Sequence, residues 1–319
     1  MDQSVYWIWL QNLRKMQVGE KLELVRRFQT PFGVYENRAG LKLEGNLDHA
    51  NRILERHDAL GIEMITPDHE RYESGMPLAV YYKGHLVDGS SMAVVGTRKC
   101  SADGYYYTVN AVGKLISEGV CINSGLAIGV DEHAHREALI SGGKVQAFLA
   151  NGLDECYPKK NKWMMNRIAE SGAVISPFAA GIAPMRHRFL ERNALMVAMS
   201  DAVLVVEASK KSGALNTAMH AKKLSKPIWT IRGPEDSPRC EGNNRLLSEG
   251  ALEYEVKPSF RQGKERELVE ILKISPMSTE TLSKLSGIEY NFLDMMLYDL
   301  ECDYWLNFKG DGKWHYNGW

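Results

Sequence analysis

Glycine-rich turns follow four apolar segments of this chain, and their residue types are suited to binding phosphate. The turns are Gly96-Thr97-Arg98, Ser124 to Gly129, Asn151-Gly152 and Ser212-Gly213-Ala214. A turn of this kind ahead of a helix exposes backbone N–H groups at the positive end of the helix dipole, a geometry that holds phosphate. The turns therefore predict phosphate binding. The residues alone leave open whether the phosphate belongs to a small nucleotide or to a nucleic acid backbone.

Basic and amide side chains accompany these turns. Arg and Lys donate charge-assisted hydrogen bonds to phosphate, and Phe189 lies between Arg188 and Arg192. Basic residues interleaved with aromatics suit a single nucleic acid strand, whose phosphates and bases both need contacts. The alternative is a set of solvated surface charges. The candidate DNA- or phosphate-binding residues are Gly96, Thr97, Arg98, Ser124, Gly125, Gly129, Lys159, Lys160, Asn161, Arg186, Arg188, Arg192, Asn193, Lys211, Ser212, Gly213 and Thr217.

Asp131 and His135 lie one helical turn apart just after the second turn. This spacing puts both side chains on one helix face, where they could act as an acid–base pair or hold a metal ion. We favour a structural role instead. Asp131 is expected to cap or brace the loop, and His135 is expected to hydrogen-bond within the core. No catalytic residue and no metal site is predicted.

Short apolar segments alternate with helix-like segments between Met92 and Ala251. The predicted strands are Met92–Gly96, Val120–Asn123, Val145–Ala150, Ala173–Ile175, Ala202–Glu207 and Pro227–Ile231. The predicted helices are Tyr106–Glu118, Asp131–Ser141, Lys162–Glu170, Phe189–Met199 and Leu215–Leu224. Strand–helix alternation predicts an α/β fold, with a doubly wound and mostly parallel Rossmann-like sheet. In such sheets ligands bind at the carboxyl ends of the strands, where all four turns fall.

The flanks differ from this central region, which we place at residues 62–256. Residues 1–61 read as a small helical domain, from the amphipathic segments Tyr6–Leu10, Leu22–Phe28 and Ala50–Leu60. Ile62–Gly84 reads as a connector in which two prolines prevent long helices.

Residues 257–319 have the outline of a winged helix. A helix is expected after the N-cap segment Ser278–Thr281, Gly287 ends it, and a second helix covers Tyr290–Glu301. Two strands, Tyr304–Phe308 and Lys313–Tyr316, would form the hairpin. Residues 260–319 hold seven Lys and Arg against ten Asp and Glu. Because phosphates repel an acidic element, we predict that this domain contacts a protein partner.

Composition sets the outer bounds. The 319 residues carry a net charge of −1, so any polyanion site must be a local patch. The five cysteines form no C-x-x-C pair, which argues against a zinc site or a disulfide framework and predicts a reduced, cytoplasmic protein. No apolar run approaches the roughly 18 residues of a membrane span. No G-x-G-x-x-G follows a strand, so a dinucleotide-dependent oxidoreductase is not predicted.

Taken together and in order, the motifs resemble those of the DprA/Smf family. The resemblance covers about 160 residues. It is carried by Gly96-Thr97-Arg98 with Ser101 and Gly104, Ser124 to His135, Asn151 to Asp154, Tyr157-Pro158 with Asn161, Phe189 with Arg192-Asn193, Val206-Glu207-Ala208 with Ser212 to Ala218, and Gly242-Asn243. The resemblance implies sequence-independent binding of single-stranded DNA, dimerisation through the core, loading of a RecA-type recombinase, no enzymatic chemistry and no cofactor.

Two other functions stay open. Pro177 and Ala194 depart from the family's usual Glu and Arg. A divergent member could therefore be a regulatory or antitoxin protein in a phage-defence module, acting through a protein partner. A nucleotide-binding enzyme similar to phosphoribohydrolases is less favoured, because the segment Ser212 to Thr217 lacks the paired glycines and following Glu of those enzymes.

Overall fold

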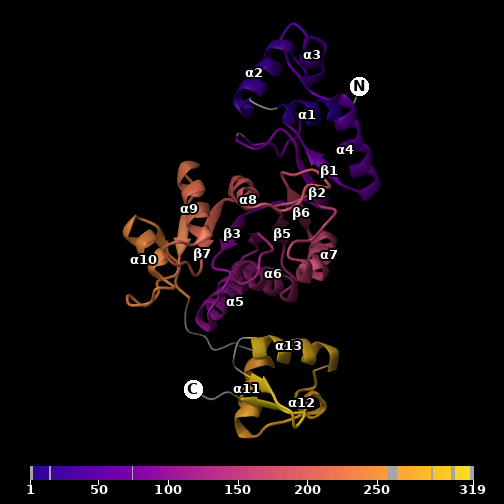
Figure 1. Cartoon of the computed structure of the whole chain (residues 1–319). Coiled ribbons are helices and arrows are strands. Elements are labelled where there is room, and N and C mark those ends of the chain that lie inside the picture. The colour runs from indigo at the N-terminus through magenta and orange to yellow at the C-terminus, as the bar shows by residue number, and fades with distance from the viewer. Residues whose placement is uncertain are drawn as a thin grey trace.

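The centre of the protein is one mixed β-sheet flanked by helices (Figure 1). The computed structural model describes residues 3–13, 16–73, 75–256, 264–288, 290–302 and 306–316. Within these residues the sheet order is β1-β2-β6-β5-β4-β3-β7-β8-β9. The strands are β1 (Glu63–Ile65), β2 (Val80–Gly84), β3 (Ser91–Val95), β4 (Cys121–Ser124), β5 (Val145–Phe148), β6 (Ala173–Ser176), β7 (Ala202–Val205), β8 (Ile228–Thr230) and β9 (Leu252–Glu253).

Each adjacent pair in the series β6-β5-β4-β3-β7-β8-β9 is parallel, which confirms the predicted α/β class and the mostly parallel sheet. The chain runs outward from β3 through β4 and β5 to β6, and then returns to β7 on the other side of β3. The strand order therefore reverses between β3 and β7. A reversal of this kind opens a crevice at the carboxyl ends of the two strands.

Helices cover both faces of the sheet. They are α5 (Ala102–Ser117), α6 (Val130–Ile140), α7 (Lys162–Ser171), α8 (Arg186–Ala198), α9 (Gly213–Lys223) and α10 (Glu241–Ser248), with the short 3-10 turn η1 (Lys159–Asn161) before α7. Residues of α5, α6 and α7 pack with one set of strand side chains, and residues of α8 and α9 pack with the other.

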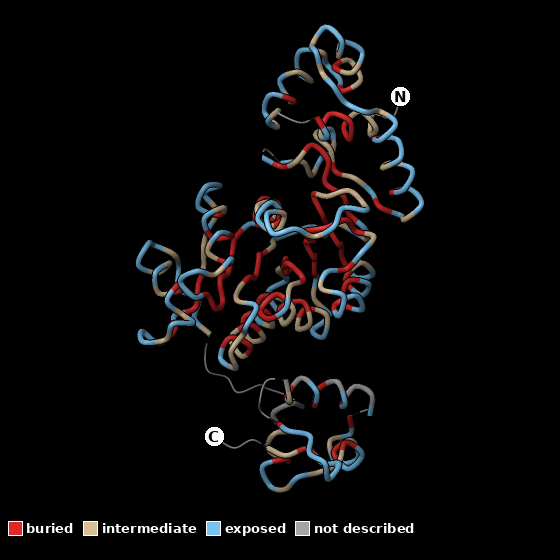
Figure 2. The backbone as a smooth tube through the Cα atoms, in the orientation of Figure 1, coloured by how far each residue is buried: buried red, intermediate tan, exposed pale blue. Residues whose placement is uncertain are grey.

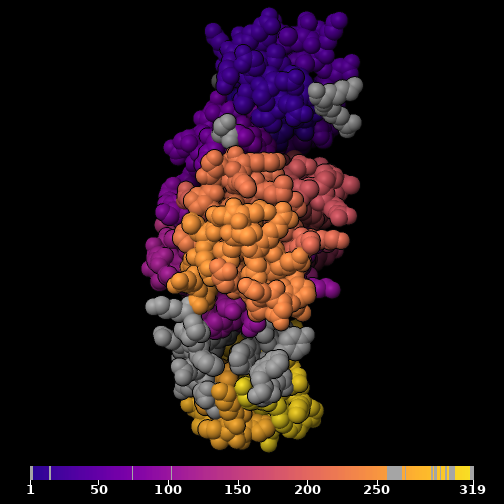
Figure 3. Space-filling view, turned by 90° about the vertical axis from the view of Figure 1, so that its left-hand side faces the viewer, coloured from indigo at the N-terminus to yellow at the C-terminus, as the bar shows by residue number. Residues whose placement is uncertain are grey.

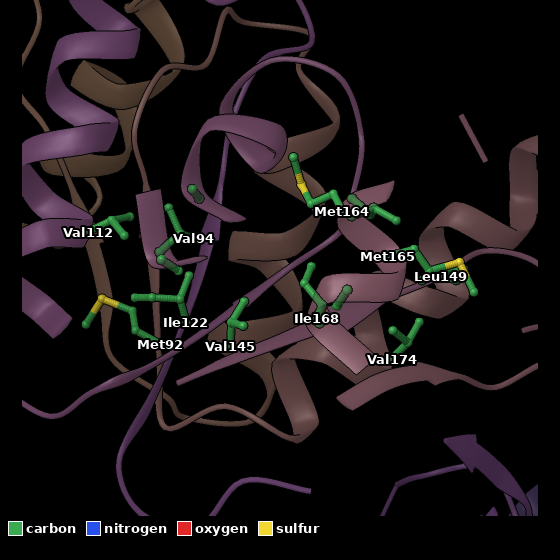
Figure 4. Packing of buried hydrophobic residues seen from close by; sticks show 14 of the residues in the cluster. Met92, Val94, Val112, Ile122, Val145, Leu149, Met164, Met165, Ile168 and Val174 are labelled. Carbon is green, nitrogen blue, oxygen red and sulfur yellow. The ribbon is translucent and has the colours of Figure 1, made fainter. Parts of the chain in front are cut away.

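Alternate residues of each strand enter opposite cores. In β3, Val94 joins the core under α5 to α7, which Figure 4 shows from close by, and Ala93 joins the core under α8 and α9. The strands are therefore buried on both faces, and they form the red centre of the core in Figure 2. This is why they read in the sequence as continuous apolar runs.

The segment expected to be a simple connector contains two strands. β1 pairs antiparallel with β2, and β2 pairs antiparallel with β6. The two prolines that exclude long helices, Pro67 and Pro77, lie between these strands rather than in them. The connector prediction was therefore incomplete, because short strands with prolines nearby give only a weak period-2 signal.

The N-terminal helices are α1 (Ser4–Gln11), α2 (Val18–Phe28), α3 (Pro31–Glu36) and α4 (Leu47–Leu60). They share a core with Leu78 of the connector. The Trp7 indole donates to Asp68 at 2.6 Å, and Gln11 exchanges two hydrogen bonds with the backbone of Ala79. Helix α3 was not predicted, although Thr30 caps it and Pro31 starts it.

The C-terminal unit has its own hydrophobic core. Its elements are α11 (Lys264–Ile274), α12 (Thr279–Ser286), α13 (Tyr290–Cys302), β10 (Leu306–Phe308) and β11 (Trp314–Tyr316). Ser278 caps α12, and Gly287 ends it with a φ of 64°. Tyr304 and Trp305, at the start of the predicted hairpin, lie outside the described residues. The winged-helix assignment stays a prediction. In the described part of the chain, no helix is long and apolar enough to cross a membrane.

Candidate nucleic-acid interface

A cavity of about 580 Å³ lies at the carboxyl ends of β3 and β7, where the strand order reverses. Its walls come from the segment after β3, the start of α6, the start of α8 and the start of α9. The lining residues are Val95, Gly96, Thr97, Arg98, Ala127, Asp131, Tyr157, Pro184, Met185, Arg186, Phe189, Leu190, Arg192, Asn193, Ser209, Ser212, Gly213, Ala214 and Thr217. The fold therefore brings together parts of three of the four glycine-rich turns: Gly96-Thr97-Arg98, Ala127 of the Ser124 to Gly129 turn, and Ser212-Gly213-Ala214.

Nine of the predicted binding residues line this cavity. They are Gly96, Thr97, Arg98, Arg186, Arg192, Asn193, Ser212, Gly213 and Thr217. Ser212 is the N-cap of α9, and its hydroxyl accepts from the Ala214 amide at 3.3 Å. The Ser212, Ala214 and Leu215 amides donate within the chain. Since the start of α9 lines the cavity, a phosphate group there would meet the positive end of the helix.

The other eight predicted residues lie outside the lining. Ser124, Gly125, Gly129 and Asn161 are buried, while Lys159, Lys160 and Lys211 are exposed and Arg188 is half-buried. Lys160 forms an ion pair with Glu132 at 2.9 Å, and Arg188 donates to the carbonyl of Ala183. The two groups differ in kind: the buried residues shape the loop behind the cavity, and the exposed ones extend a basic surface.

The loop from Ser124 to Gly129 is held in a fixed shape from several sides. The Ser124 hydroxyl donates to the carbonyl of Val94 at 2.7 Å, and the Asn161 amide donates to the carbonyl of Leu126 at 3.0 Å. Leu126 adopts a φ of 53° with its side chain fully buried. At Gly129 the φ is 87°, and a Cβ atom would collide with the Thr97 carbonyl, so only glycine fits.

Asp131 and Arg192 stabilise this loop from beneath. Asp131 accepts backbone hydrogen bonds from Gly125 and Ala127. The Arg192 guanidinium donates to the carbonyls of Gly125 and Phe148 and to the Asn193 side chain. Arg192 is only 3% exposed, so its guanidinium N–H groups bond mainly to other groups of the protein rather than to a ligand.

Burial shifts the ionisation of both groups. It raises the pKa of Asp131 to about 6, against the opposing effect of the nearby Arg192 charge and the two amides. It lowers the pKa of Arg192 to about 10, which Asp131 partly offsets. Both side chains line the cavity and are charged at neutral pH, so a ligand there meets a fixed, nearly neutral pair rather than an isolated cation.

His135 lies at the centre of α6 and is fully buried. Among the described residues its ring nitrogens form no close, well-aligned hydrogen bond, but the Ser124 backbone lies near enough to favour protonation of the ring. The predicted core hydrogen bond stays a prediction. Desolvation dominates and lowers the pKa of His135 to about 3. The histidine is thus a neutral packing residue under the loop. No group of three or more His, Cys, Asp or Glu side chains that could hold a metal ion occurs in the described residues.

Aromatic and apolar side chains form the rim of the cavity. The Arg98 guanidinium lies 4.9 Å from the centre of the Phe189 ring, and the Tyr157 ring meets Phe189 edge-on at 6.0 Å. Met185 and Leu190 are 51% and 45% exposed beside them. The list of predicted binding residues omitted these apolar residues. The pairing of Tyr157 with Pro158 and the position of Phe189 between two arginines were the available signals.

The cavity carries a local positive surface despite the net charge of the chain. Arg98, Arg186 and Lys211 are exposed, and none of them forms an ion pair within the part of the chain that the structure describes. A cationic surface beside aromatic rings is typical of sites for single-stranded nucleic acid.

The largely parallel sheet, with its cavity at the point of strand reversal and the start of α9 in the cavity lining, defines a Rossmann-like fold. The model of the DNA recombination-mediator protein A family matches residues 64–260, and the chain belongs to this family.

Relatives and solved structures agree with this assignment. A relative from Mycobacterium tuberculosis is 41% identical over 159 residues, which are 50% of this chain and 41% of that protein. DNA processing protein DprA from Streptococcus pneumoniae is 35% identical over 177 residues, 55% of this chain and 62% of that protein. This chain therefore matches less than two thirds of the length of these curated relatives.

The crystal structure of DprA from Streptococcus pneumoniae is similar to this fold. Its TM-score is 0.68 at 26% identity, covering 80% of this chain and 95% of that one. A structure of DNA processing protein A from Helicobacter pylori, described for its single-stranded DNA binding mode, has a TM-score of 0.53 at 28% identity, covering 60% and 90%.

Proposed function

We propose that this protein binds single-stranded DNA at the β3–β7 cavity and its rim, without sequence preference. The observation that carries the proposal is the juxtaposition of Arg98, Arg186 and the start of α9 with the exposed Tyr157 ring and the half-buried Phe189 ring. Cations and amides take the phosphates, and the aromatic rim offers stacking surfaces that accept any base. The related protein from Helicobacter pylori is described as binding single-stranded DNA.

The residues divide into two roles. Arg98, Arg186, Lys211 and the start of α9 contact the strand. Arg192, Asp131 and the buried glycines fix the loop that shapes the cavity, and so act as positioning residues. This division departs from the sequence prediction for Arg192, because its donors already serve the Gly125 and Phe148 carbonyls.

The test is fluorescence-anisotropy binding of a labelled thymidine oligonucleotide over a salt series. Each phosphate contact contributes about 0.7 to the slope of log affinity against log salt for single strands. Arg98→Ala and Arg186→Ala are expected to weaken binding and to lower this slope. Arg26→Ala, which removes an exposed arginine of α2 paired with Glu23, is the matched control and keeps the slope. Absence of binding at low salt would overturn the proposal.

We further propose that the protein forms a homodimer through its core and loads a RecA-type recombinase on the bound strand, as its family membership suggests. The support is the match of residues 64–260, not a contact in this structure. The test measures how fast recombinase filaments form on DNA coated with single-strand-binding protein, with and without this chain. Arg98→Ala is expected to remove the acceleration. Equal filament rates with and without the wild-type chain would overturn this role.

The C-terminal unit has a surface suited to a protein partner, which supports a regulatory role alongside DNA binding. Ile274, Leu285 and Tyr298 are 84%, 59% and 60% exposed, on a unit whose sequence is acidic. Such a partner could belong to a phage-defence module. Removal of residues 257–319 is expected to abolish partner capture while DNA binding persists, and loss of both together would contradict separate roles.

A further inference from the structure

A second, smaller cavity of about 220 Å³ adjoins the first along the segment that follows β3. Its walls come from the start of α5, the end of β7 and the segment between β8 and α10; among them are Ser101, Tyr107, Glu207, Gly233, Arg239 and Cys240. The Thr97 amide, which belongs to the first cavity, donates to the backbone carbonyl of Glu207 at 2.8 Å. The two cavities therefore share this segment as a common wall.

Glu207 is a buried carboxylate with one unused oxygen. The residue is 2% exposed, and its Oε2 accepts from the Ser101 amide at 2.9 Å. Its Oε1 has no hydrogen-bond partner among the described residues. A buried carboxylate oxygen without a donor is costly, so the lining of this cavity contains an acceptor that a ligand could satisfy.

The charge of Glu207 is already balanced. The Arg239 Nη1 atom lies 3.9 Å from Oε1, which is close enough for an ion pair but too far for a hydrogen bond. The Arg239 side chain is 61% exposed, and within the described residues the hydrogen bond given for it runs at 3.4 Å to the Lys99 carbonyl rather than to Glu207. What Glu207 lacks is a hydrogen-bond donor rather than a cation. A neutral N–H donor suits the site better than an ammonium or guanidinium group.

We infer that this second cavity binds the Watson–Crick edge of a guanine base from the strand held in the first cavity. Glu207 can still accept two adjacent N–H bonds, because Oε1 has no donor and Oε2, which accepts from Ser101, has a second lone pair. Guanine carries two adjacent donors on that edge, whereas each other base carries only one. The half-buried Tyr107 ring lines the same cavity and offers an aromatic surface. This inference rests on the proposed DNA site, and it adds a base preference to otherwise sequence-tolerant binding.

The experiment compares thymidine oligonucleotides that carry one central guanine, hypoxanthine, adenine or cytosine, with the full-length protein. The guanine strand is expected to bind about tenfold more tightly than the all-thymidine strand. Hypoxanthine, which lacks the 2-amino donor and so carries one donor as thymine does, is expected to bind about as weakly as the all-thymidine strand. Equal affinities for all strands, with no binding of deoxyguanosine monophosphate, would overturn the inference.

Two variants locate the preference. Glu207→Gln is expected to bring the guanine-to-thymidine affinity ratio close to one, and Glu249→Gln, an exposed carboxylate on α10, is the matched control that keeps the wild-type ratio. Should Glu207→Gln fail to fold, Arg239→Ala, which removes the charged group beside Oε1, is expected to increase the ratio, and an unchanged ratio would then contradict the inference. A wild-type ratio in a folded Glu207→Gln protein contradicts the inference.

A separate experiment tests whether the second cavity takes its guanine only from a DNA strand or also from a free nucleotide. Calorimetric titration with deoxyguanosine monophosphate tests whether a free nucleotide also enters, and binding that Glu207→Gln abolishes would assign the cavity to the same base. Failure of the thymidine strand to bind overturns the proposed DNA function instead. In that case the nucleotide titration still decides whether the cavity recognises guanine.

Discussion

At the residue scale, buried polar side chains determine the shape of the candidate site. Arg192 and Asp131 lie side by side under the Ser124–Gly129 loop, and each satisfies backbone groups of that loop. Desolvated charges of this kind persist only when they are paired and hydrogen-bonded. Removing one partner would leave the other charge buried, so substitutions here should act on the loop before they act on DNA.

Gly125 gives the sharpest test of this packing. A Cβ atom at this position would overlap the Arg192 guanidinium and the Asp131 carboxylate. Gly125→Ala is expected to lower the free energy of unfolding by about 2 kcal/mol, as measured by urea denaturation. Gly19→Ala in α2, where a Cβ meets open space, is the matched control and should be neutral or stabilising. Equal stability of the Gly125→Ala protein and the wild type would contradict the described packing.

His135 predicts how stability depends on pH. Its pKa is about 3 in the folded protein, below the ordinary value of 6.5, so the unfolded chain binds a proton first. The contribution of the neutral His135 to the free energy of unfolding is therefore complete above pH 6.5, and it is lost as the pH falls toward 3. His57 and His133, with pKa values of about 4, act in the same direction. The carboxyl of Asp131, whose pKa is about 6, opposes them by gaining a proton in the folded state.

The measurement is urea denaturation of wild type and His135→Gln at about pH 7.5 and about pH 5. Between these two pH values, each neutral buried histidine should lower the free energy of unfolding by about 2 kcal/mol. The loss is about 1.4 kcal/mol for each pH unit below the ordinary pKa of histidine. His135→Gln should therefore lose about 2 kcal/mol less than the wild type on acidification. An identical loss in both proteins would show that His135 does not titrate with unfolding.

Sequence reasoning found most of the residues at this scale but could not assign their depth. Gly-rich turns and basic residues are visible as types, so nine of the predicted residues meet in the cavity. The burial of Arg192 was not visible, because it depends on the Gly125 and Phe148 carbonyls, which come from distant parts of the chain.

At the scale of elements, α4 is joined to the segment that leads into the site. Arg56 pairs with Asp154 at 2.7 Å, and Asp154 accepts from the Gly181 amide at 2.8 Å. His57 accepts from the Ala180 amide at 2.9 Å through its Nε2. The chain reaches Arg186 and α8 only a few residues later. The N-terminal helices and the wall of the cavity are therefore packed as neighbours.

A double-mutant cycle tests this connection. Arg56→Ala and Asp154→Ala are expected to show a coupling energy of about 0.5 kcal/mol in chemical denaturation, because the arginine is half exposed and its charge is screened. Arg167 and Glu170, an exposed pair within α7, serve as the matched control and should couple no more strongly. Additive effects of Arg56→Ala and Asp154→Ala would contradict the connection.

The central strands were predicted to within a few residues because both of their faces are buried. β1, β2 and β9 were missed for the opposite reason: β1 and β9 have only three and two residues, and β2 ends at exposed positions. Helix α11 was missed because its apolar positions depend on packing against α12 and β11, which the sequence does not reveal.

At the scale of the whole molecule, separate hydrophobic cores indicate separate folding units. Among the described residues, the core of α11 to β11 contains none from before Leu268, whereas the N-terminal core extends into the connector through Leu78. The boundary near residue 256 stays a prediction, which the separate cores support. The predicted boundary near residue 61 instead runs through a shared core.

Truncation after Val256 tests this difference. The shortened protein is expected to keep the thermal unfolding midpoint of its sheet within about 2 °C, because no cluster residue of the sheet is removed. Calorimetry of the full and shortened chains measures it. A chain starting at Ile62, which loses the partners of Leu78 and Met64, is expected to melt several degrees lower. Equal losses from the two truncations would contradict separate folding units.

The side of the molecule shown in Figure 3 is formed largely by the orange residues of the α9 and α10 region. Their backbone reaches the same strand ends as the two cavities, since α9 begins at Gly213 in the first and Cys240 precedes α10 in the second. A substitution at the start of α9 or α10 should therefore be tested for its effect on ligand binding in both cavities.

The glycines beneath the site also limit how this loop can evolve. At Gly96, Gly125 and Gly129 the space that a Cβ would need is filled by Val130, by Arg192 with Asp131, and by the Thr97 carbonyl. Any single replacement by a larger residue meets an occupied position, and two of these neighbours are themselves needed by the loop. Paths to a different loop shape must therefore pass through less stable intermediates or change several positions at once.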